Sequence, residues 1–336
     1  MKICIIGARG HIGYVFKGLQ KLPEVRVAAV ASGSEEDDTS VLEQLCGELG
    51  QHPVVYADWR AMLDEVKPDL VAIDGPFHLH AEMAADALKR GIHVFCEKPI
   101  ALTLEELATL REAWRASGRH IRSMVGLRYA PAFLYARRLV ADGAVGKIKF
   151  IRTQKSYKLG SRPEFYRHRA TYGGTIPWVG SHAVDWILYY SGARFERVTA
   201  LHNAEDNRGH GDLEVVGHAL FALSGGIIAD AGIDYLRPDA APTHGDDRVR
   251  IAGTKGVLEV RGGQVILTDA DGEKVIDPPE ADRDVFSDFV LELTEGRPAL
   301  VDDDQTFQLA EAILLARDSA DRGETLTFPG REKGSK

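Results

Sequence analysis

Near the start of the chain, the residues whose type and spacing suggest a binding site are three glycines spaced three apart, Gly7, Gly10 and Gly13. They follow a short apolar run, residues 3–6, and precede a segment whose apolar residues have helical spacing. A glycine turn of this kind lets the backbone approach a pyrophosphate, and the start of the helix offers free N–H groups to it. This context predicts a dinucleotide site, and the alternative is a tight turn without a ligand. The predicted cofactor contacts in the turn are Gly7, Arg9, Gly10, His11 and Ile12.

The residue that reads the cofactor ribose is expected about 20 residues beyond the glycines, at the end of the second strand, where an acidic residue favours NAD. Ser32 stands near this place, and an acidic run, residues 35–38, follows it. Ser32 and Arg9 could accommodate the 2′-phosphate of NADP, whereas the acidic run opposes a phosphate if it points inward. The run can equally be a solvated loop. The sequence therefore predicts NAD or NADP and leaves the preference open.

Two side chains further along the chain suit the polarisation of a substrate hydroxyl and the transfer of its proton. Lys98 follows a predicted strand, at the carboxyl edge where ligands bind in open α/β sheets, and its ammonium can orient and polarise a hydroxyl. The alternative is a surface lysine that pairs with Glu97. His182 is predicted on a helix, and histidine suits proton exchange at neutral pH. The alternative there is a buried structural histidine bonded to Asp185.

Helices and strands must position these residues. Along the chain, apolar runs typical of strands alternate with segments that have helical spacing. Such alternation predicts βαβ units and a parallel sheet. Thr103 and Glu106 have capping-box spacing and open a helix that ends near Gly118. We therefore predict an α/β fold with an N-terminal Rossmann domain over residues 1–122 and a second domain over residues 123–336. The predicted strands of the first domain are residues 3–6, 27–31, 54–56, 69–73, 92–96 and 120–125.

Composition narrows the class of protein. The chain has 336 residues, enough for two domains, and a formal net charge of −9. An acidic chain is a poor candidate for nucleic-acid binding, which needs clustered Lys and Arg. No apolar stretch approaches the ~20 residues of a membrane span, and no secretory signal is present, so we expect a cytoplasmic protein without a membrane partner. Neither the three cysteines nor His210, His218 and His244 have metal-ligand spacing, so no metal site is expected.

Four stretches of the chain resemble one known family. The longest runs from Asp69 to Leu107 and contains Pro76, His80 and the triplet Glu97-Lys98-Pro99. The others are residues 126–131, which read Gly-Leu-Arg-Tyr-Ala-Pro, residues 173–185 with a glycine pair, His182 and Asp185, and residues 253–256, which read Gly-Thr-Lys-Gly. Together they resemble the glucose–fructose oxidoreductase and inositol dehydrogenase family, often called Gfo/Idh/MocA, from Lys2 to about Phe328.

The resemblance implies a C-terminal α+β domain with a large open, mostly antiparallel sheet that serves as a subunit interface. The sequence agrees, because alternating or β-rich runs separated by Gly, Asp and Pro occur in this half. They are residues 197–202, 217–222, 226–233, 248–251 and 257–260. An open sheet needs cover for its apolar face and edges, so a homodimer or homotetramer is expected.

For function, the resemblance implies an NAD(P)-dependent oxidoreductase that transfers a hydride between nicotinamide and a polyol, sugar or sugar-derived hydroxy or keto compound. Lys98 and His182 are then the catalytic residues. The further implied cofactor contacts are Pro76, His80, Glu97 and Lys98, and the implied substrate contacts are Lys98, Arg128, Lys155, Trp178 and His182. Lys155 opens a basic stretch, residues 155–169, that suits an anionic substrate or is a solvated loop at a second subunit.

One position departs from the family pattern, which commonly has an Asp four residues before the histidine. Trp178 stands there instead. Either His182 works with Lys98 alone, or another carboxylate assists, or the chemistry is weakened. Trp178 could present an aromatic face to a sugar ring or be an ordinary core residue. Two rival functions stay open: a glycosidase-type hydrolase that retains its NAD, and a catalytically weakened regulatory protein that binds a dinucleotide.

Overall fold

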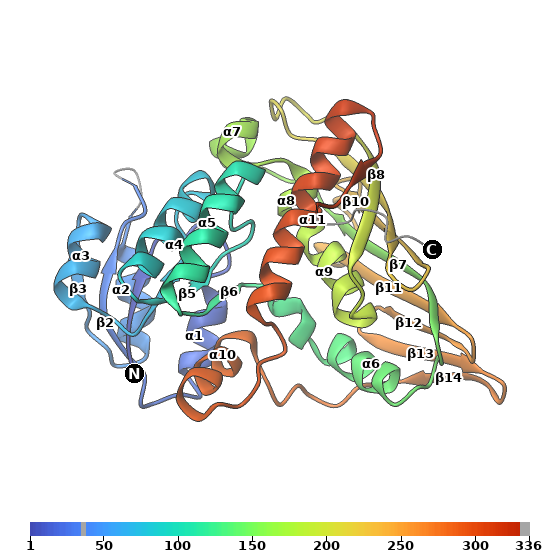
Figure 1. Cartoon of the computed structure of the whole chain (residues 1–336), viewed down its shortest axis with the longest axis horizontal. Helices are drawn as coiled ribbons and strands as arrows, with labels where there is room; N and C mark the ends of the chain where they lie inside the picture. Colours follow the sequence, from blue (N-terminus) through green and yellow to red (C-terminus); the bar gives the residue numbers. More distant parts are fainter. Residues whose placement is uncertain (35–37, 330–336) are drawn as a thin grey trace. The chain divides into compact units, whose positions relative to one another are not determined.

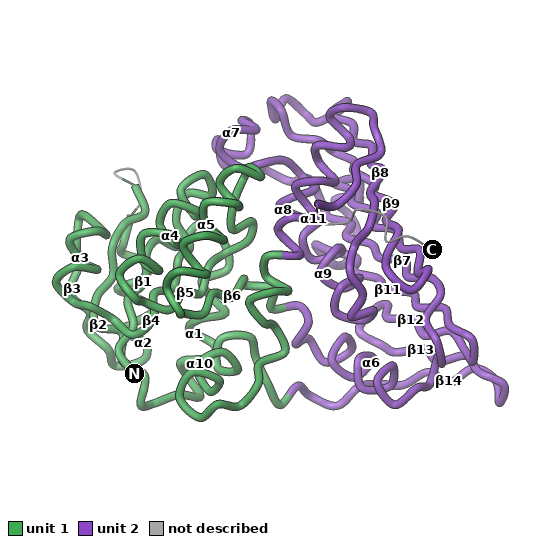
Figure 2. The backbone as a smooth tube through the Cα atoms, in the orientation of Figure 1, with its two compact units in different colours: residues 1–126, 282–307 green, residues 127–281, 308–336 purple. Residues whose placement is uncertain are grey.

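The chain passes from a first unit to a second after Gly126 and returns to the first for residues 282–307 (Figure 2). Unit 1 is residues 1–126 and 282–307, and unit 2 is residues 127–281 and the chain from Gln308 onward. The computed structural model describes residues 1–34 and 38–329. The predicted boundary, between residues 122 and 123, lies close to the first crossing, and the return segment 282–307 is not part of that prediction.

Unit 1 contains a parallel sheet with the strand order β3-β2-β1-β4-β5-β6. Apart from the exposed edge strand β3, its strands are mostly buried, as expected for parallel strands covered on both faces. The strand order reverses between β1 and β4, which is where ligands bind in folds of this kind. The parallel Rossmann sheet predicted from the sequence is confirmed. The strands are β1 (Lys2–Ile6), β2 (Arg26–Ala31), β3 (Val54–Tyr56), β4 (Leu70–Ile73), β5 (His93–Cys96) and β6 (Ile121–Ser123).

Three helices of unit 1, α3, α5 and α10, have a side-chain N-cap. Thr103 and Glu106 form the predicted capping box, and that helix ends at Gly118 in the left-handed conformation. The helices are α1 (Gly13–Leu19), α2 (Ser40–Glu48), α3 (Trp59–Val66), the 3-10 turn η1 (Phe77–Leu79), α4 (His80–Lys89), α5 (Leu104–Ser117) and α10 (Val285–Glu295). Helix α4 packs against α5, and α1 packs against α10 (Figure 1).

The return segment completes unit 1 around one buried cation. Arg122 on β6 is almost fully buried and forms ion pairs with Asp303 and with Glu292, the latter at 2.6 Å. Asp303 also accepts hydrogen bonds from the backbone N–H of Ile121 at 2.7 Å and from the ring of His120 at 2.8 Å. A buried charge needs such partners. The first sheet is therefore held at β6 by residues that lie about 170–180 positions later in the chain.

Unit 2 contains a sheet with the order β14-β13-β12-β11-β7-β10-β9-β8-β15. Its neighbours pair in antiparallel fashion except for the central pair β7 and β10, which is parallel. The large, mostly antiparallel sheet expected from the sequence is confirmed. The strands are β7 (Ile148–Tyr157), β8 (Phe195–Asn203), β9 (Val216–Leu223), β10 (Ile227–Asp234), β11 (Gly245–Gly253), β12 (Val257–Arg261), β13 (Gln264–Asp269), β14 (Gly272–Ile276) and β15 (Leu326–Thr327).

The helices of unit 2 pack on one face of this sheet, α6 over β12 and β13, α8 over β9, and α9 over β7 and β10 (Figure 1). Residues on the opposite face alternate with the buried ones, and Leu201, Leu220 and Ile228 are exposed there. The remaining elements are η2 (Gly126–Tyr129), α6 (Pro131–Ala141), η3 (Glu164–Arg167), α7 (Arg169–Tyr172), α8 (Thr175–Trp178), α9 (Gly180–Ser191) and α11 (Asp303–Arg322). Within the described ranges, no helix combines the length and the apolar character that crossing a bilayer requires.

Candidate active site

The glycine turn of unit 1 follows β1, as the sequence predicts. Gly7 has a φ of 72°, and its N–H donates to the carbonyl of Ala31 at 3.0 Å. A Cβ on Gly7 would lie 2.6 Å from the Cα of Gly75, so only glycine fits there. A Cβ on Gly10 would lie 2.7 Å from Oδ1 of Asp74 and 2.8 Å from Cγ of Glu97. The space above Gly10 is therefore occupied by the protein's own carboxylates.

Asp74 is the residue that sequence reasoning missed at this turn. It follows β4, is fully buried, and its carboxylate accepts the N–H groups of Gly10 at 2.8 Å and Ile12 at 2.9 Å. Its backbone carbonyl accepts the N–H of Arg9 at 2.8 Å. Burial and the neighbouring charge of Glu97 raise the pKa of Asp74 well above its ordinary value, although the two N–H donors oppose this shift. The sequence signal was an acidic residue at the end of an apolar run, directly before a glycine.

Lys98 lies at the carboxyl end of β5 and is only 2% exposed, so it is not a surface lysine. Its ammonium is 3.8 Å from Oε1 of Glu97, a fully buried carboxylate. The same oxygen contacts Nδ1 of His11, from the glycine turn, at 2.6 Å. The Lys98–Pro99 peptide bond is cis. Three predicted site residues of unit 1 are thus brought together around one carboxylate.

His80 and Pro76 lie next to the turns that carry this cluster. The two ring nitrogens of His80 face the carbonyl oxygens of Pro99 at 2.9 Å and Gly75 at 3.0 Å, and the ring is fully buried. Burial lowers the pKa of His80. Pro76 directly precedes η1, whose C-terminal neighbour is His80. His80 therefore ties the turn after β4 to the turn that carries Lys98.

The candidate ribose reader lies at the end of β2. The guanidinium of Arg9 donates to the hydroxyl of Ser34 at 3.1 Å, which brings the glycine turn and the end of β2 together. The hydroxyl of Ser32 donates to the carbonyl of Ala57 at 3.3 Å. Of the acidic run that bears on NAD or NADP, residues 35–37 lie outside the described part of the chain.

In unit 2, His182 and Trp178 lie on neighbouring short helices and are both buried. Asp185, the partner considered for His182 from the sequence, is engaged by another residue. Both of its oxygens accept hydrogen bonds from the guanidinium of Arg128, at 2.6–3.0 Å, and each side chain is 1% exposed. Arg128, predicted to contact substrate, is thus committed to a buried ion pair, and it lies over the ring of Tyr189.

Lys155 is buried on the helix-covered face of β7, opposite Asp247 on β11, and the two form an ion pair at 2.6 Å. Its ammonium lies 5.4 Å from the ring centre of Trp186 on α9. Burial lowers the pKa of Lys155, and the charge of Asp247 counteracts this shift. The sequence placed this residue in a basic stretch, but β7 is a central strand of the sheet.

The other cations of the basic stretch also have partners within unit 2. Lys158 donates to the carbonyl of Asp239 at 2.8 Å, and Arg162 donates to that of Leu159 at 2.9 Å. Arg167 pairs with Glu164, and Arg169 with Glu214. The positive charge of this stretch is therefore largely used inside the protein.

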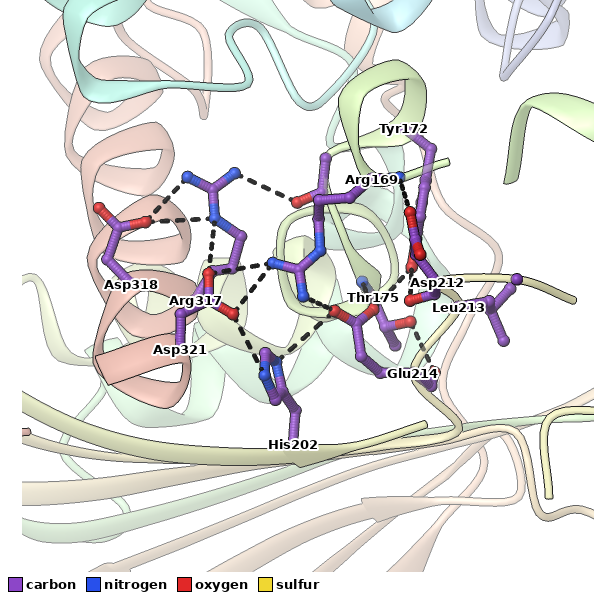
Figure 3. A network of polar contacts seen from close by, with 12 residues as sticks. Arg169, Tyr172, Thr175, His202, Asp212, Leu213, Glu214, Arg317, Asp318 and Asp321 are labelled. Atoms are coloured by element: carbon purple, nitrogen blue, oxygen red, sulfur yellow. Dashed lines mark hydrogen bonds and ion pairs between the residues drawn. The ribbon is translucent and has the colours of Figure 1, made fainter. Parts of the chain in front are cut away.

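A polar network holds the start of the helices that carry Trp178 and His182 (Figure 3). Glu214, which is 3% exposed, accepts the hydroxyl of Tyr172 at 2.6 Å and the N–H of Thr175, the first residue of α8, at 2.9 Å. Arg169 pairs with the same carboxylate and with Asp321 on α11 at 3.1 Å. His202 on β8 contacts Asp321 at 3.2 Å. The network links α7, α8, α11 and the sheet at one point.

Comparison with known proteins places these two units in one family. Residues 1–125 match the family described as "Oxidoreductase family, NAD-binding Rossmann fold", and residues 133–259 match the "GFO/IDH/MocA C-terminal domain". A solved structure of a Thermotoga maritima protein is 42% identical, has a TM-score of 0.93, and covers 98% of this chain and 100% of that one.

Two relatives carry more specific names. D-xylose 1-dehydrogenase (NADP(+)) 2 of Haloferax volcanii is 26% identical over 89% of this chain and 91% of its own length. Levoglucosan dehydrogenase of Pseudarthrobacter phenanthrenivorans is 30% identical over 43% of this chain and 38% of its own length. A levoglucosan dehydrogenase solved with NADH and L-sorbose is 19% identical with a TM-score of 0.83 over 98% of this chain and 99% of that one, a likeness of fold alone. The chain belongs to the GFO/IDH/MocA family of NAD-binding oxidoreductases.

Proposed function

We propose that this protein is an NAD(P)-dependent dehydrogenase or reductase acting on the CH–OH group of a polyol, sugar or sugar-derived compound. The observation that carries the proposal is Lys98, a buried lysine at the carboxyl end of β5 that shares Glu97 with the glycine turn. A buried ammonium at a ligand-binding sheet edge suits the polarisation of a substrate oxygen. The dehydrogenase names of the relatives support the same substrate class.

The residues of unit 1 fit a dinucleotide in a specific way. Oε2 of Glu97 is a buried oxygen that accepts no hydrogen bond from the described residues, and a ribose hydroxyl would satisfy it. The N–H groups of Gly10 and Ile12 are held by Asp74, so these two residues shape the turn rather than donate to phosphate. Arg9 carries the permanent positive charge of the turn, which suits the phosphates, and its guanidinium donates to Ser34. The nicotinamide, when bound, accepts or gives the hydride.

Each site residue has a proposed role in the reaction. Lys98 orients and polarises the reacting oxygen, and His182 exchanges its proton with that oxygen. His80 positions Lys98 through the carbonyl of Pro99. Trp178 offers its indole face to the sugar ring. Arg128 and Lys155, which are buried with Asp185 and Asp247, position the substrate side of unit 2 as ion pairs.

A neutral sugar or polyol suits unit 2 better than a sugar acid. The basic stretch that favours an anionic substrate in the sequence has its cations paired with carboxylates and carbonyls. At Lys155, which is buried, a carboxylate substrate would have to displace Asp247, and breaking a buried ion pair costs about 3–5 kcal/mol.

The experiment is a panel of polyols, neutral sugars and sugar acids with NAD and with NADP, read at the absorbance of the reduced cofactor. We expect net reduction of the cofactor with a neutral substrate, and we expect Lys98→Gln to lose this activity. Lys17→Gln, at an exposed lysine, is the matched control. Cleavage of glycosides without net reduction would establish the hydrolase instead. Tight cofactor binding with no turnover on any substrate would establish the regulatory protein.

We also propose that the protein assembles as a homodimer or homotetramer through the open face of the second sheet. Leu201, Leu220 and Ile228 are 70%, 49% and 52% exposed on that face. Large apolar side chains that gather on one sheet face are typical of a buried interface. The charged pair Arg152–Asp230 stands among them at 3.1 Å. The test is the oligomeric state of the face variants given in the Discussion.

A further inference from the structure

One oxygen of Glu97 is shared by two groups that can carry a proton. Oε1 lies 2.6 Å from Nδ1 of His11 and 3.8 Å from Nζ of Lys98. Glu97 is fully buried, and the side chain of Lys98 is 3% exposed, but that of His11 is 35% exposed. A line of titratable groups, with one gap of 3.8 Å between Nζ and Oε1, therefore leads from the buried lysine to solvent.

The other titratable groups around Glu97 are held by other contacts. Both oxygens of Asp74 accept backbone N–H groups of the glycine turn, and burial keeps its pKa well above the ordinary range. The two ring nitrogens of His80 face backbone carbonyls. The thiol of Cys96 donates to the carbonyl of Glu97 at 3.4 Å, and burial raises its pKa well above the usual value. The ring of Tyr14 stacks on His11 at 5.5 Å.

Nδ1 of His11 and Nζ of Lys98 approach the same carboxylate oxygen from two sides. A positive charge on either group is attracted by that oxygen and repelled by a positive charge on the other. A carboxylate oxygen placed between two groups that can each carry a proton is the arrangement that a proton-conducting chain needs.

We propose that Glu97 and His11 form a relay that exchanges protons between Lys98 and solvent. The proposal rests on the proposed function, since it assigns a path for the proton of the oxidised alcohol. A path is needed because the side chain of Lys98 is 3% exposed and Glu97 is fully buried, so neither group exchanges protons with water directly.

In this relay the neutral amine of Lys98 performs the proton exchange that the proposed function assigns to His182. In oxidation, the amine takes the hydroxyl proton while the adjacent C–H bond gives its hydride to the nicotinamide and the C–O bond becomes a carbonyl. Nζ then moves into hydrogen-bond distance and transfers one proton to Oε1 of Glu97. Oε1 passes that proton to Nδ1 of the His11 tautomer that carries its hydrogen on Nε2, and Nε2 then releases that hydrogen to water. A flip of the ring returns an unprotonated nitrogen to Oε1 for the next turnover. Reduction runs the same steps in reverse.

The first test needs no substrate. The ring nitrogens of His11 are followed by ¹⁵N NMR in the whole chain, with assignment from His11→Gln. We expect Lys98→Gln to move the His11 signals, because it removes the cation that shares Oε1. Lys21→Gln is the matched control, since Lys21 is a lysine of unit 1 that pairs with Asp284. Signals of His11 that do not respond to Lys98→Gln overturn the relay, whatever the activity.

The second test uses a sugar that the panel shows to be oxidised, at saturating cofactor because His11 is also a predicted cofactor contact. We expect His11→Gln to lower kcat by about 10²-fold, the lower end for loss of acid–base assistance. Added imidazole buffer should restore part of the rate in this variant and leave the parent protein unchanged. A full rate in His11→Gln, or a lost rate that imidazole does not restore, contradicts the relay. Absence of turnover in the parent protein would instead contradict the proposed function, and the NMR result would still decide the coupling.

Discussion

Glu214 holds Thr175 through its side chain and its backbone at once. Oε2 accepts the N–H of Thr175 at 2.9 Å, and the carbonyl oxygen accepts its hydroxyl at 2.7 Å. Thr175 opens α8, directly after Gly173 and Gly174, which have positive φ angles of 86° and 109°. Glu214, in the loop before β9, therefore holds the first residue of α8 by two hydrogen bonds (Figure 3).

The first prediction concerns this contact. Glu214→Ala should lower the free energy of unfolding by about 2–3 kcal/mol, because it removes the acceptor of the N–H of Thr175 and of the hydroxyl of Tyr172 and one of the two carboxylate partners of Arg169. It should also lower kcat more than it raises KM, since His182 lies on α9. Urea unfolding and steady-state kinetics measure both effects. The matched pair is Thr175→Ser, which keeps the hydroxyl, and Thr175→Val, which removes it; equal behaviour of the two would show that the hydroxyl bond to Glu214 has no role.

The second prediction concerns acid stability through His93. Burial, with His120 and Arg119 nearby, lowers the pKa of His93 to about 4, and its Nδ1 accepts the N–H of His120 at 3.0 Å. Because the folded pKa lies below the unfolded value near ~6.5, this contribution to stability is present above pH ~6.5. It is lost as the pH falls from there towards 4, by roughly 1–2 kcal/mol after solvent screening.

His93→Asn should keep an acceptor for that N–H and flatten the pH dependence of unfolding between pH ~6.5 and 4. Chemical denaturation at several pH values measures how steeply the free energy of unfolding changes with pH. His52→Asn, at an exposed histidine of the same unit, is the control and should follow the parent protein. A slope in His93→Asn equal to that of the control would show that another group titrates in this window.

The third prediction separates two glycines of the turn. Gly10→Ala should destabilise the fold by about 1–3 kcal/mol, because its Cβ would press on Asp74 and Glu97. The same change should weaken NADH binding, because the turn and Glu97 would shift. Gly13→Ala meets nothing within 4 Å and should be tolerated or slightly stabilising in α1. Thermal unfolding and fluorescence titration with NADH measure both, and equal effects at the two sites would contradict this account of the turn.

The fourth prediction concerns assembly through the open sheet face. Leu220→Glu and Ile228→Glu each place a charge on that face and should convert the oligomer to a smaller species in light scattering. Val54→Glu, at an equally exposed apolar residue on β3 of unit 1, is the control and should leave the mass unchanged. A parent protein that is already monomeric at micromolar concentration would refute the proposed interface.

The sequence predicts those helices and strands in which apolar residues recur with the regular spacing of a helix or a strand. Strands β1 to β5 consist mainly of apolar residues and β6 reads Ile-Arg-Ser, and the positions of β1 to β6 match the predictions within two residues at each end. Strand β7 was missed because its buried face carries Thr153 and Lys155, so the alternation of apolar and polar residues is disguised. Its partner strands, which bury Ala, Val and Ile, were predicted.

Parts of the site depend on contacts between distant residues, and a local pattern does not report these. Spacing along a helix makes Asp185 a natural partner for His182, but Arg128, 57 residues earlier, takes its carboxylate. Asp74 and Gly10 are 64 residues apart, so their hydrogen bond is visible only once β1 and β4 pair. The residues that the sequence located well are those at strand ends, such as Lys98 and the glycines, because the fold alone places them.

The return of residues 282–307 to unit 1 sets an order of events during synthesis. Arg122 is buried as a charge, and its acceptors Glu292 and Asp303 leave the ribosome about 180 residues after Gly126. At about 5–20 residues per second, this interval is roughly 10–40 s, during which the nascent Rossmann sheet has an unpaired arginine at β6. The cofactor-binding unit is therefore completed only after the whole of the second sheet up to β14 has been translated.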